Sequence, residues 1–195
     1  MKYKGKEKRM KFIDKEIENE AVLDIAKMMC ISARTSPKTK GQDNIATLIL
    51  TGEDINNLAD QMEILDKKIN GDTKTSITRD AGNLRKSAAL VLVGAKKEYY
   101  GLECGYCGFE SCSECIKNGK QCVFSSINLG IAVDAAAKTA SNLDTDCRIM
   151  YTAGRAYGEY NPDENMIWLG IPLSATGKSI YFDRPAVAKN PAKSK

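Results

Sequence analysis

Five of the chain's seven cysteines lie close together between Cys104 and Cys122, in the run CGYCGFESCSECIKNGKQC. Thiolate is the soft ligand that holds iron–sulfur clusters, and such a cluster needs four protein sulfurs around one inorganic core. Gly105 and Gly108 each follow a cysteine, where a chain that wraps a small group often needs a positive φ angle. We therefore predict an iron–sulfur site in this segment.

The composition excludes several other kinds of site. The 195 residues include no histidine, which rules out Ser-His-Asp and Cys-His catalysis, His-ligated zinc and Rieske-type ligation. Any proton transfer would have to use carboxylates, lysine, tyrosine, cysteine or a bound cofactor. Composition alone therefore identifies no catalytic residue, and these residues are unknown.

Charge and hydropathy bear on location and partners. No apolar run approaches the ~18 residues that suggest a membrane span, and the basic start of the chain leads into no apolar signal segment. We expect a cytoplasmic protein, in which thiols stay reduced and seven cysteines indicate metal or redox chemistry before disulfides. The net charge of +4 comes visibly from the two ends of the chain and has no RNA- or DNA-binding motif beside it, so we expect no nucleic-acid or membrane partner.

Apolar periodicity predicts alternating helices and strands. The expected helices cover residues 17–34, 54–70, 123–143 and 150–160, with a short one near Asn83, and the expected strands cover 45–50, 88–95 and 166–171, the last ended by Pro172. This order predicts an α+β fold in three layers, with a mixed sheet flanked by helices. We expect one domain over residues 1–185, an inserted cluster-binding segment at 101–123 and a flexible tail at 186–195.

The spacing of the cysteines leaves two ligand sets open. Cys107, Cys112 and Cys115 match the plant-type [2Fe–2S] spacing, with Cys147 as a distant fourth ligand. The competing set is Cys104, Cys107, Cys112 and Cys122. A zinc ribbon usually separates its two Cys-x2-Cys pairs by roughly 15–20 residues, and the gap here is much shorter. Zinc is therefore the weaker alternative.

The segment resembles a small iron–sulfur motif, CGxCGxxxC…C, in which four cysteines bind one [4Fe–4S] cluster. Matched residue by residue, the resemblance implies Cys104, Cys107, Cys112 and Cys122 as the ligands, with Cys115 lacking a counterpart. Together with SARTSPKTKGQDNI, NLGIAVDAAAKTAS and LGIPLSATGKSIYFDR, the segment is similar to a family of uncharacterised ferredoxin-domain proteins of bacteria and archaea. That resemblance covers most of residues 17–185.

The order of elements also resembles a nitroreductase-like scaffold. There a helix ends in Ala-Arg-x-x-Pro, as at Ala33–Pro37, a long central helix forms the core of a homodimer, and a strand ends in Leu-Gly-x-Pro. The resemblance implies a homodimer and admits FMN as a second cofactor. The residues that can contact a small anion such as a flavin phosphate are Ser174, Thr176, Lys178 and Arg184.

Three functions follow as hypotheses. The first is electron transfer through one [4Fe–4S] cluster to an unknown redox partner. The second is an FMN-dependent, nitroreductase-like oxidoreductase fed by the cluster, with Arg34 as a flavin contact. The third is a structural or sensor protein stabilised by zinc.

Overall fold

The computed structural model describes residues 11–163 and 165–182. The predicted tail at 186–195 and the predicted anion contact Arg184 lie outside these residues. The described helices are α1 (Asp14–Thr35), α2 (Gly52–Asn70), α3 (Ser76–Leu84), α4 (Cys112–Lys117), α5 (Val123–Asn142) and α6 (Tyr151–Tyr160), with a 3-10 turn at Thr39–Gly41. The described strands are β1 (Ile45–Leu50), β2 (Ala89–Lys96), β3 (Asp146–Cys147) and β4 (Met166–Ser174).

The four described strands form one sheet in the order β1-β2-β4-β3, and all neighbouring pairs are antiparallel. The predicted α+β class is confirmed, whereas the predicted mixed sheet is wrong in its strand directions. The sequence pattern could not reveal this, because a strand buried on both faces is apolar throughout in either direction. β2 lies at the centre and is buried at every position except Lys96.

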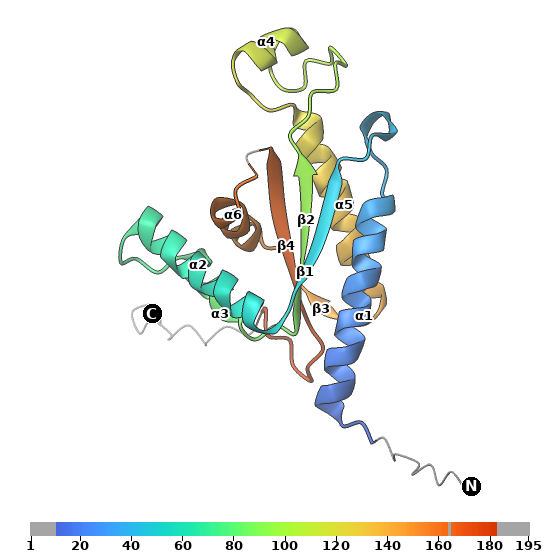
Figure 1. The fold of residues 1–195 in the computed structure, drawn as a ribbon, viewed down its shortest axis with the longest axis vertical. Helices are drawn as coiled ribbons and strands as arrows, with labels where there is room; N and C mark the ends of the chain where they lie inside the picture. The colour runs from blue at the N-terminus through green and yellow to red at the C-terminus, as the bar shows by residue number, and fades with distance from the viewer. Residues whose placement is uncertain (1–10, 164, 183–195) are drawn as a thin grey trace, which may run out of the picture.

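Two helical layers cover the sheet, as Figure 1 shows. α1 and α5 pack on one face, where Val91, Val93 and Ile171 contribute to a core with Met29 and Ala132. α2, α3 and α6 pack on the other face, around the remaining side chains of the same strands. Successive side chains of a strand point to opposite faces of the sheet, so alternate residues contribute to different hydrophobic cores.

Two strands differ from prediction in detail. β1 was expected to be covered on both faces, but it is an edge strand and residues 46–50 are half-buried. β4 was expected to end at Pro172, yet it continues to Ser174. The backbone N–H and C=O of Gly170 bond to Met150, on the side of β4 away from β2. The backbone nitrogen of Pro172, two residues later, faces the same side. The proline therefore removes no hydrogen bond from the β2–β4 ladder.

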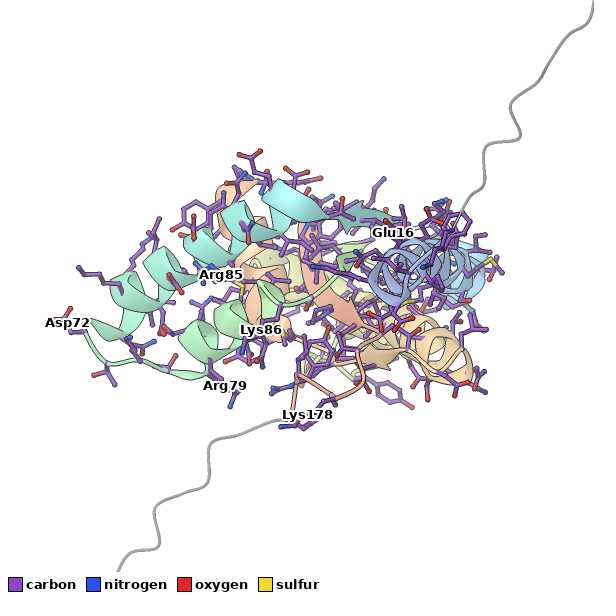
Figure 2. The ribbon with its side chains drawn as sticks, turned by 90° about the horizontal axis from the view of Figure 1, so that it is seen from below. Glu16, Asp72, Arg79, Arg85, Lys86 and Lys178 are labelled. Atoms are coloured by element: carbon purple, nitrogen blue, oxygen red, sulfur yellow. The ribbon has the colours of Figure 1, made fainter. Side chains whose placement is uncertain are left out.

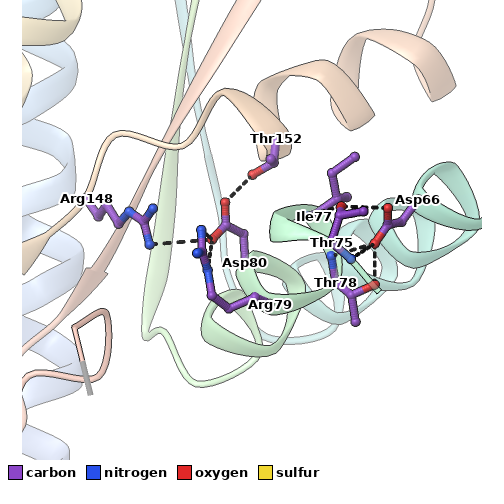
Figure 3. Close-up of polar contacts among 8 residues, drawn as sticks. All are labelled: Asp66, Thr75, Ile77, Thr78, Arg79, Asp80, Arg148 and Thr152. Atoms are coloured by element: carbon purple, nitrogen blue, oxygen red, sulfur yellow. Dashed lines mark hydrogen bonds and ion pairs between the residues drawn. The ribbon is translucent and has the colours of Figure 1, made fainter. Parts of the chain in front are cut away.

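Buried carboxylates tie the second helical layer together (Figure 3). Asp66 of α2 is 2% exposed and accepts hydrogen bonds from the backbone N–H groups and the hydroxyls of Thr75 and Thr78 at 2.6–3.1 Å. Asp80 of α3 is 3% exposed and accepts a hydrogen bond of 2.9 Å from Thr152 of α6. These contacts join α2 to α3 and α3 to α6.

The cysteine segment stands outside both layers, beyond one end of the sheet (Figure 1). It leaves β2, contains the short helix α4, and returns to begin α5, whose N-cap is Cys122. At its base, the Tyr99 hydroxyl donates to the Lys120 carbonyl at 2.6 Å, and Ser125 bonds to the backbone of Glu98 at 3.1 Å. The sheet and α5 thus fix both ends of the segment.

Candidate metal centre

The five clustered cysteines line one enclosed cavity. The chain turns tightly there: Gly105, Gly108 and Glu103 have positive φ angles, and Gly108 N–H donates to the Gly105 carbonyl at 2.9 Å. The other lining residues are mostly apolar or aromatic: Tyr99, Leu102, Gly105, Phe109, Ser111, Val123 and Phe124. The cysteines are therefore gathered in a place that water reaches poorly.

Helix α4 positions two of the thiols. Its N-cap Ser111 accepts a hydrogen bond from Glu114 N–H at 3.1 Å, and Glu103 accepts one from Cys112 N–H at 2.8 Å. Cys112 and Cys115 are three residues apart, which places them on one face of the helix. A helix of six residues is too short to show a helical hydrophobic pattern, so the sequence did not predict α4.

Cys115 is the most buried of the group, with 1% of its surface exposed. Its thiol lies 3.4 Å from the Lys120 carbonyl and 3.8 Å from the Gln121 carbonyl. Burial raises the pKa of Cys115, and the neighbouring thiols of Cys107, Cys122 and Cys112 raise it further. These three thiols thus lie near enough to Cys115 to affect its pKa.

The remaining two cysteines lie elsewhere. Cys30 of α1 is half-buried against the α1–α5 core. Cys147 of β3 contacts the Ala137 carbonyl at 3.9 Å, and Ala137 lies fifteen residues along α5 from Cys122, which corresponds to about 22 Å of helix. The structure therefore does not bring Cys147 to the other cysteines, and the plant-type ligand set is not assembled.

The aromatic residues of the cysteine segment lie both inside and outside the cavity. Tyr99 and Phe109 line the cavity, but Tyr100 does not, and Tyr106 is 73% exposed. Tyr106 instead stacks on Phe124, with ring centroids 6.2 Å apart. Phe124 and Leu102 were missed as lining residues, since nothing in their local sequence distinguishes them from ordinary core residues.

The donor set fits an iron–sulfur cluster in its chemistry. It is made of thiols, it is enclosed by apolar side chains, and glycines let the chain turn around it. Across residues 11–163 and 165–182, no three Cys, Asp or Glu side chains are arranged to hold a single metal ion. In the same ranges no helix is long and apolar enough to cross a bilayer.

Residues 118–184 match a family described as uncharacterised proteins containing a ferredoxin domain (DUF2148). An uncharacterised protein from Archaeoglobus fulgidus is 42% identical over 180 residues, which is 88% of this chain and 96% of that protein. The chain belongs to this ferredoxin-domain family. The matched range includes Cys122 but begins after the other four clustered cysteines.

Solved structures support the predicted scaffold. An oxidoreductase containing FMN superposes with a TM-score of 0.54 at 12% identity, over 80% of this chain and 67% of that one. A nitroreductase family protein from Clostridium novyi NT gives 0.54 at 14% identity, over 88% and 81%. NfrA2 of B. megaterium gives 0.51 at 8% identity, over 80% and 58%. The ferredoxin-domain protein therefore has a nitroreductase-like α+β fold.

Proposed function

We propose that this protein transfers electrons through one [4Fe–4S] cluster bound by Cys104, Cys107, Cys112 and Cys122. The observation that carries the proposal is the single apolar cavity lined by all the clustered thiols. Membership of a ferredoxin-domain family supports it independently. Bound there, the cluster would supply a site for reversible electron uptake.

The protein's own residues would control access to that site. Tyr99, Phe109 and Phe124 would exclude water, and burial of this kind tunes the reduction potential of a cluster. Cys115 would remain a thiol, because it faces the backbone carbonyls of Lys120 and Gln121. The cysteine segment lies at the end of the molecule remote from α3 and β3 (Figure 1), where a redox partner would dock.

Metal and sulfide analysis of anaerobically purified protein tests the proposal. We expect four irons and four sulfides per chain, a broad absorbance near ~400 nm and an EPR signal after reduction. Cys104→Ser and Cys122→Ser should lose most of the iron, whereas Cys115→Ser should keep it. Cys147→Ser is the matched control, because this half-buried thiol lies outside the cavity. A colourless protein with one zinc per chain would instead support a zinc-stabilised structural or sensor role.

FMN binding is the second candidate, favoured by a cleft of about 500 Å³ between the start of α1 and the end of β4. Ser174, Thr176 and Lys86 line it, together with acidic residues of α1. Figure 2 shows Lys86 and Lys178 at this end of the molecule. Arg34, the flavin contact implied by the resemblance, is already paired with Asp43 at 2.5 Å. Release of a yellow chromophore on denaturation would establish this candidate.

A homodimer is proposed as the assembly. The partner would cover apolar side chains on the outer surfaces of α1 and α5, including Ile17, Met28, Ile31 and Ile131, each between 39% and 57% exposed. α1 and α5 lie side by side along the same face of the sheet (Figure 1). The hydroxyl oxygen of Ser32 on α1 lies 2.7 Å from the hydroxyl oxygen of Thr139 on α5.

A further inference from the structure

A second cleft, of about 350 Å³, lies at the edge of the sheet near the base of the cysteine segment. Its size falls within the range of small-molecule sites, roughly 300–1,000 Å³. It is formed by the beginning of β1, the end of β2 and the beginning of β4, together with Arg34 of α1 and Asp163. It is separate from the cavity that the cysteines line.

Small residues create the floor of this cleft. Ala46, Gly94 and Trp168 are directly opposite one another on β1, β2 and β4, so all three face the side of the sheet that carries α2 and α6. A Cβ at Gly94 would lie 2.7 Å from both Met166 Cε and the Trp168 ring. The two larger side chains therefore lean over Gly94, and Ala46 leaves space beside them.

One polar side chain in the cleft is buried and incompletely paired. Asn44 is 2% exposed; its Nδ2 contacts the Tyr100 hydroxyl, while its Oδ1 has no hydrogen-bond partner in the described residues. Tyr100 already accepts a hydrogen bond of 2.9 Å from Asn128 Nδ2. Rotating the Asn44 amide would let Oδ1 accept the Tyr100 proton, but Nδ2 would then be unpaired. In either orientation one buried amide atom has no hydrogen-bond partner among the described residues.

Opposite charges occupy the rim. Arg34 and Asp43 neutralise each other in an ion pair of 2.5 Å. Lys96 and Asp163 also line the cleft, yet neither belongs to an ion pair among the described residues. The site therefore offers an ammonium, a carboxylate and an apolar floor.

We propose that this cleft binds a small zwitterion of the α-amino-acid class with an apolar side chain. Lys96 would face its carboxylate, Asp163 its ammonium group, and Ala46 and Trp168 its side chain. The proposal does not depend on the cluster, and its test gives the same result whatever metal the cysteines hold.

Trp168 is the only tryptophan of the chain and reports directly on the cleft. We expect L-phenylalanine and L-leucine to cause a saturable change in its fluorescence, with the same dissociation constant by calorimetry. 3-Phenylpropionate lacks the ammonium group and phenethylamine lacks the carboxylate. Each should bind about fivefold more weakly than L-phenylalanine, the upper end of the loss expected for one exposed ion pair.

Variants separate the site from a general effect on the fold. Ala46→Leu fills the cleft and should abolish the response, whereas Thr47→Leu, on the opposite face of the same strand, should retain it. Lys96→Gln and Asp163→Asn alter exposed side chains, so they fold even if Ala46→Leu does not, and each should weaken binding about fivefold. Absence of a saturable response, equal binding of the three phenyl compounds, or full binding by Ala46→Leu would overturn the proposal.

Discussion

At the scale of single residues, the buried acids do more for this fold than the charged surface does. Burial alone would raise the pKa of Asp66, but hydrogen bonds from Thr78, Thr75 and Asn70 outweigh it and hold that pKa well below its usual range. The folded protein therefore favours the ionised form of Asp66. By contrast, Lys68 and Glu159 form an exposed ion pair at 2.7 Å, and exposed pairs contribute about 0–1 kcal/mol.

Asp66→Asn should lower the free energy of unfolding by about 2–3 kcal/mol at pH 7, since its amide group would face hydrogen-bond donors. A carboxylate with a depressed folded pKa stabilises the protein above its ordinary pKa, near ~4, and loses that contribution as pH falls through the folded value. The difference between wild type and variant should therefore shrink below about pH 4 in urea denaturation. Asp72→Asn is the control, because Asp72 is exposed at the tip of the same connection (Figure 2). A pH-independent difference would contradict this account.

At the scale of elements, the contact between α6 and β4 determines how closely the second helical layer approaches the sheet. Gly154 of α6 lies against the backbone of β4, and a Cβ there would be 2.1 Å from the Trp168 carbonyl oxygen. The Trp168 ring packs edge-on against Tyr157, with centroids 5.0 Å apart. Only a residue without a side chain allows the helix and strand to be this close.

Gly154→Ala should destabilise the protein by about 1–3 kcal/mol, because helix and strand must move apart. Gly130→Ala in α5 is a matched control, since a Cβ there meets nothing within 4 Å. It should instead stabilise the fold by about 0.5–1 kcal/mol through helix propensity. Thermal unfolding of both variants measures the two effects. Equal changes in Tm would show that the α6–β4 approach is not constrained by Gly154.

At the scale of the whole molecule, the outer surfaces of the neighbouring helices α1 and α5 carry exposed apolar side chains. Each of these helices buries one side against the sheet and keeps two isoleucines exposed on the other: Ile17 and Ile31 on α1, and Ile127 and Ile131 on α5. An apolar surface of this kind is stable in water when a second copy covers it.

Ile131→Lys should convert a dimer to a monomer in sedimentation velocity, because a buried lysine at the interface would be unpaired. Ile64→Lys is the control: Ile64 is 58% exposed on α2, across the sheet from α1 and α5. It should leave the sedimentation coefficient unchanged. A monomeric wild-type protein at micromolar concentration would contradict the dimer.

Local patterns account for most of the secondary structure. The predicted strand at 45–50 matches β1, and the helices near 54–70, 123–143 and 150–160 are all present. The segment from 72 to 87 was harder: its only predicted element was a short helix near Asn83, and α3 buries Asp80, an acid that pairs with the distant Thr152, beside Ile77 and Leu84. Side chains that act through distant partners leave no signal in neighbouring residues.

By itself the chain indicated most of its helices and strands, and that five thiols would share one short segment, because both depend on residues adjacent in sequence. Only the tertiary structure decided that these thiols line a single cavity, that Cys147 lies about 22 Å of helix away, and that Asn44 and Trp168 meet at one cleft. Those facts depend on the antiparallel pairing of β1, β2 and β4. Pairing is set by packing between distant segments, which no local pattern records.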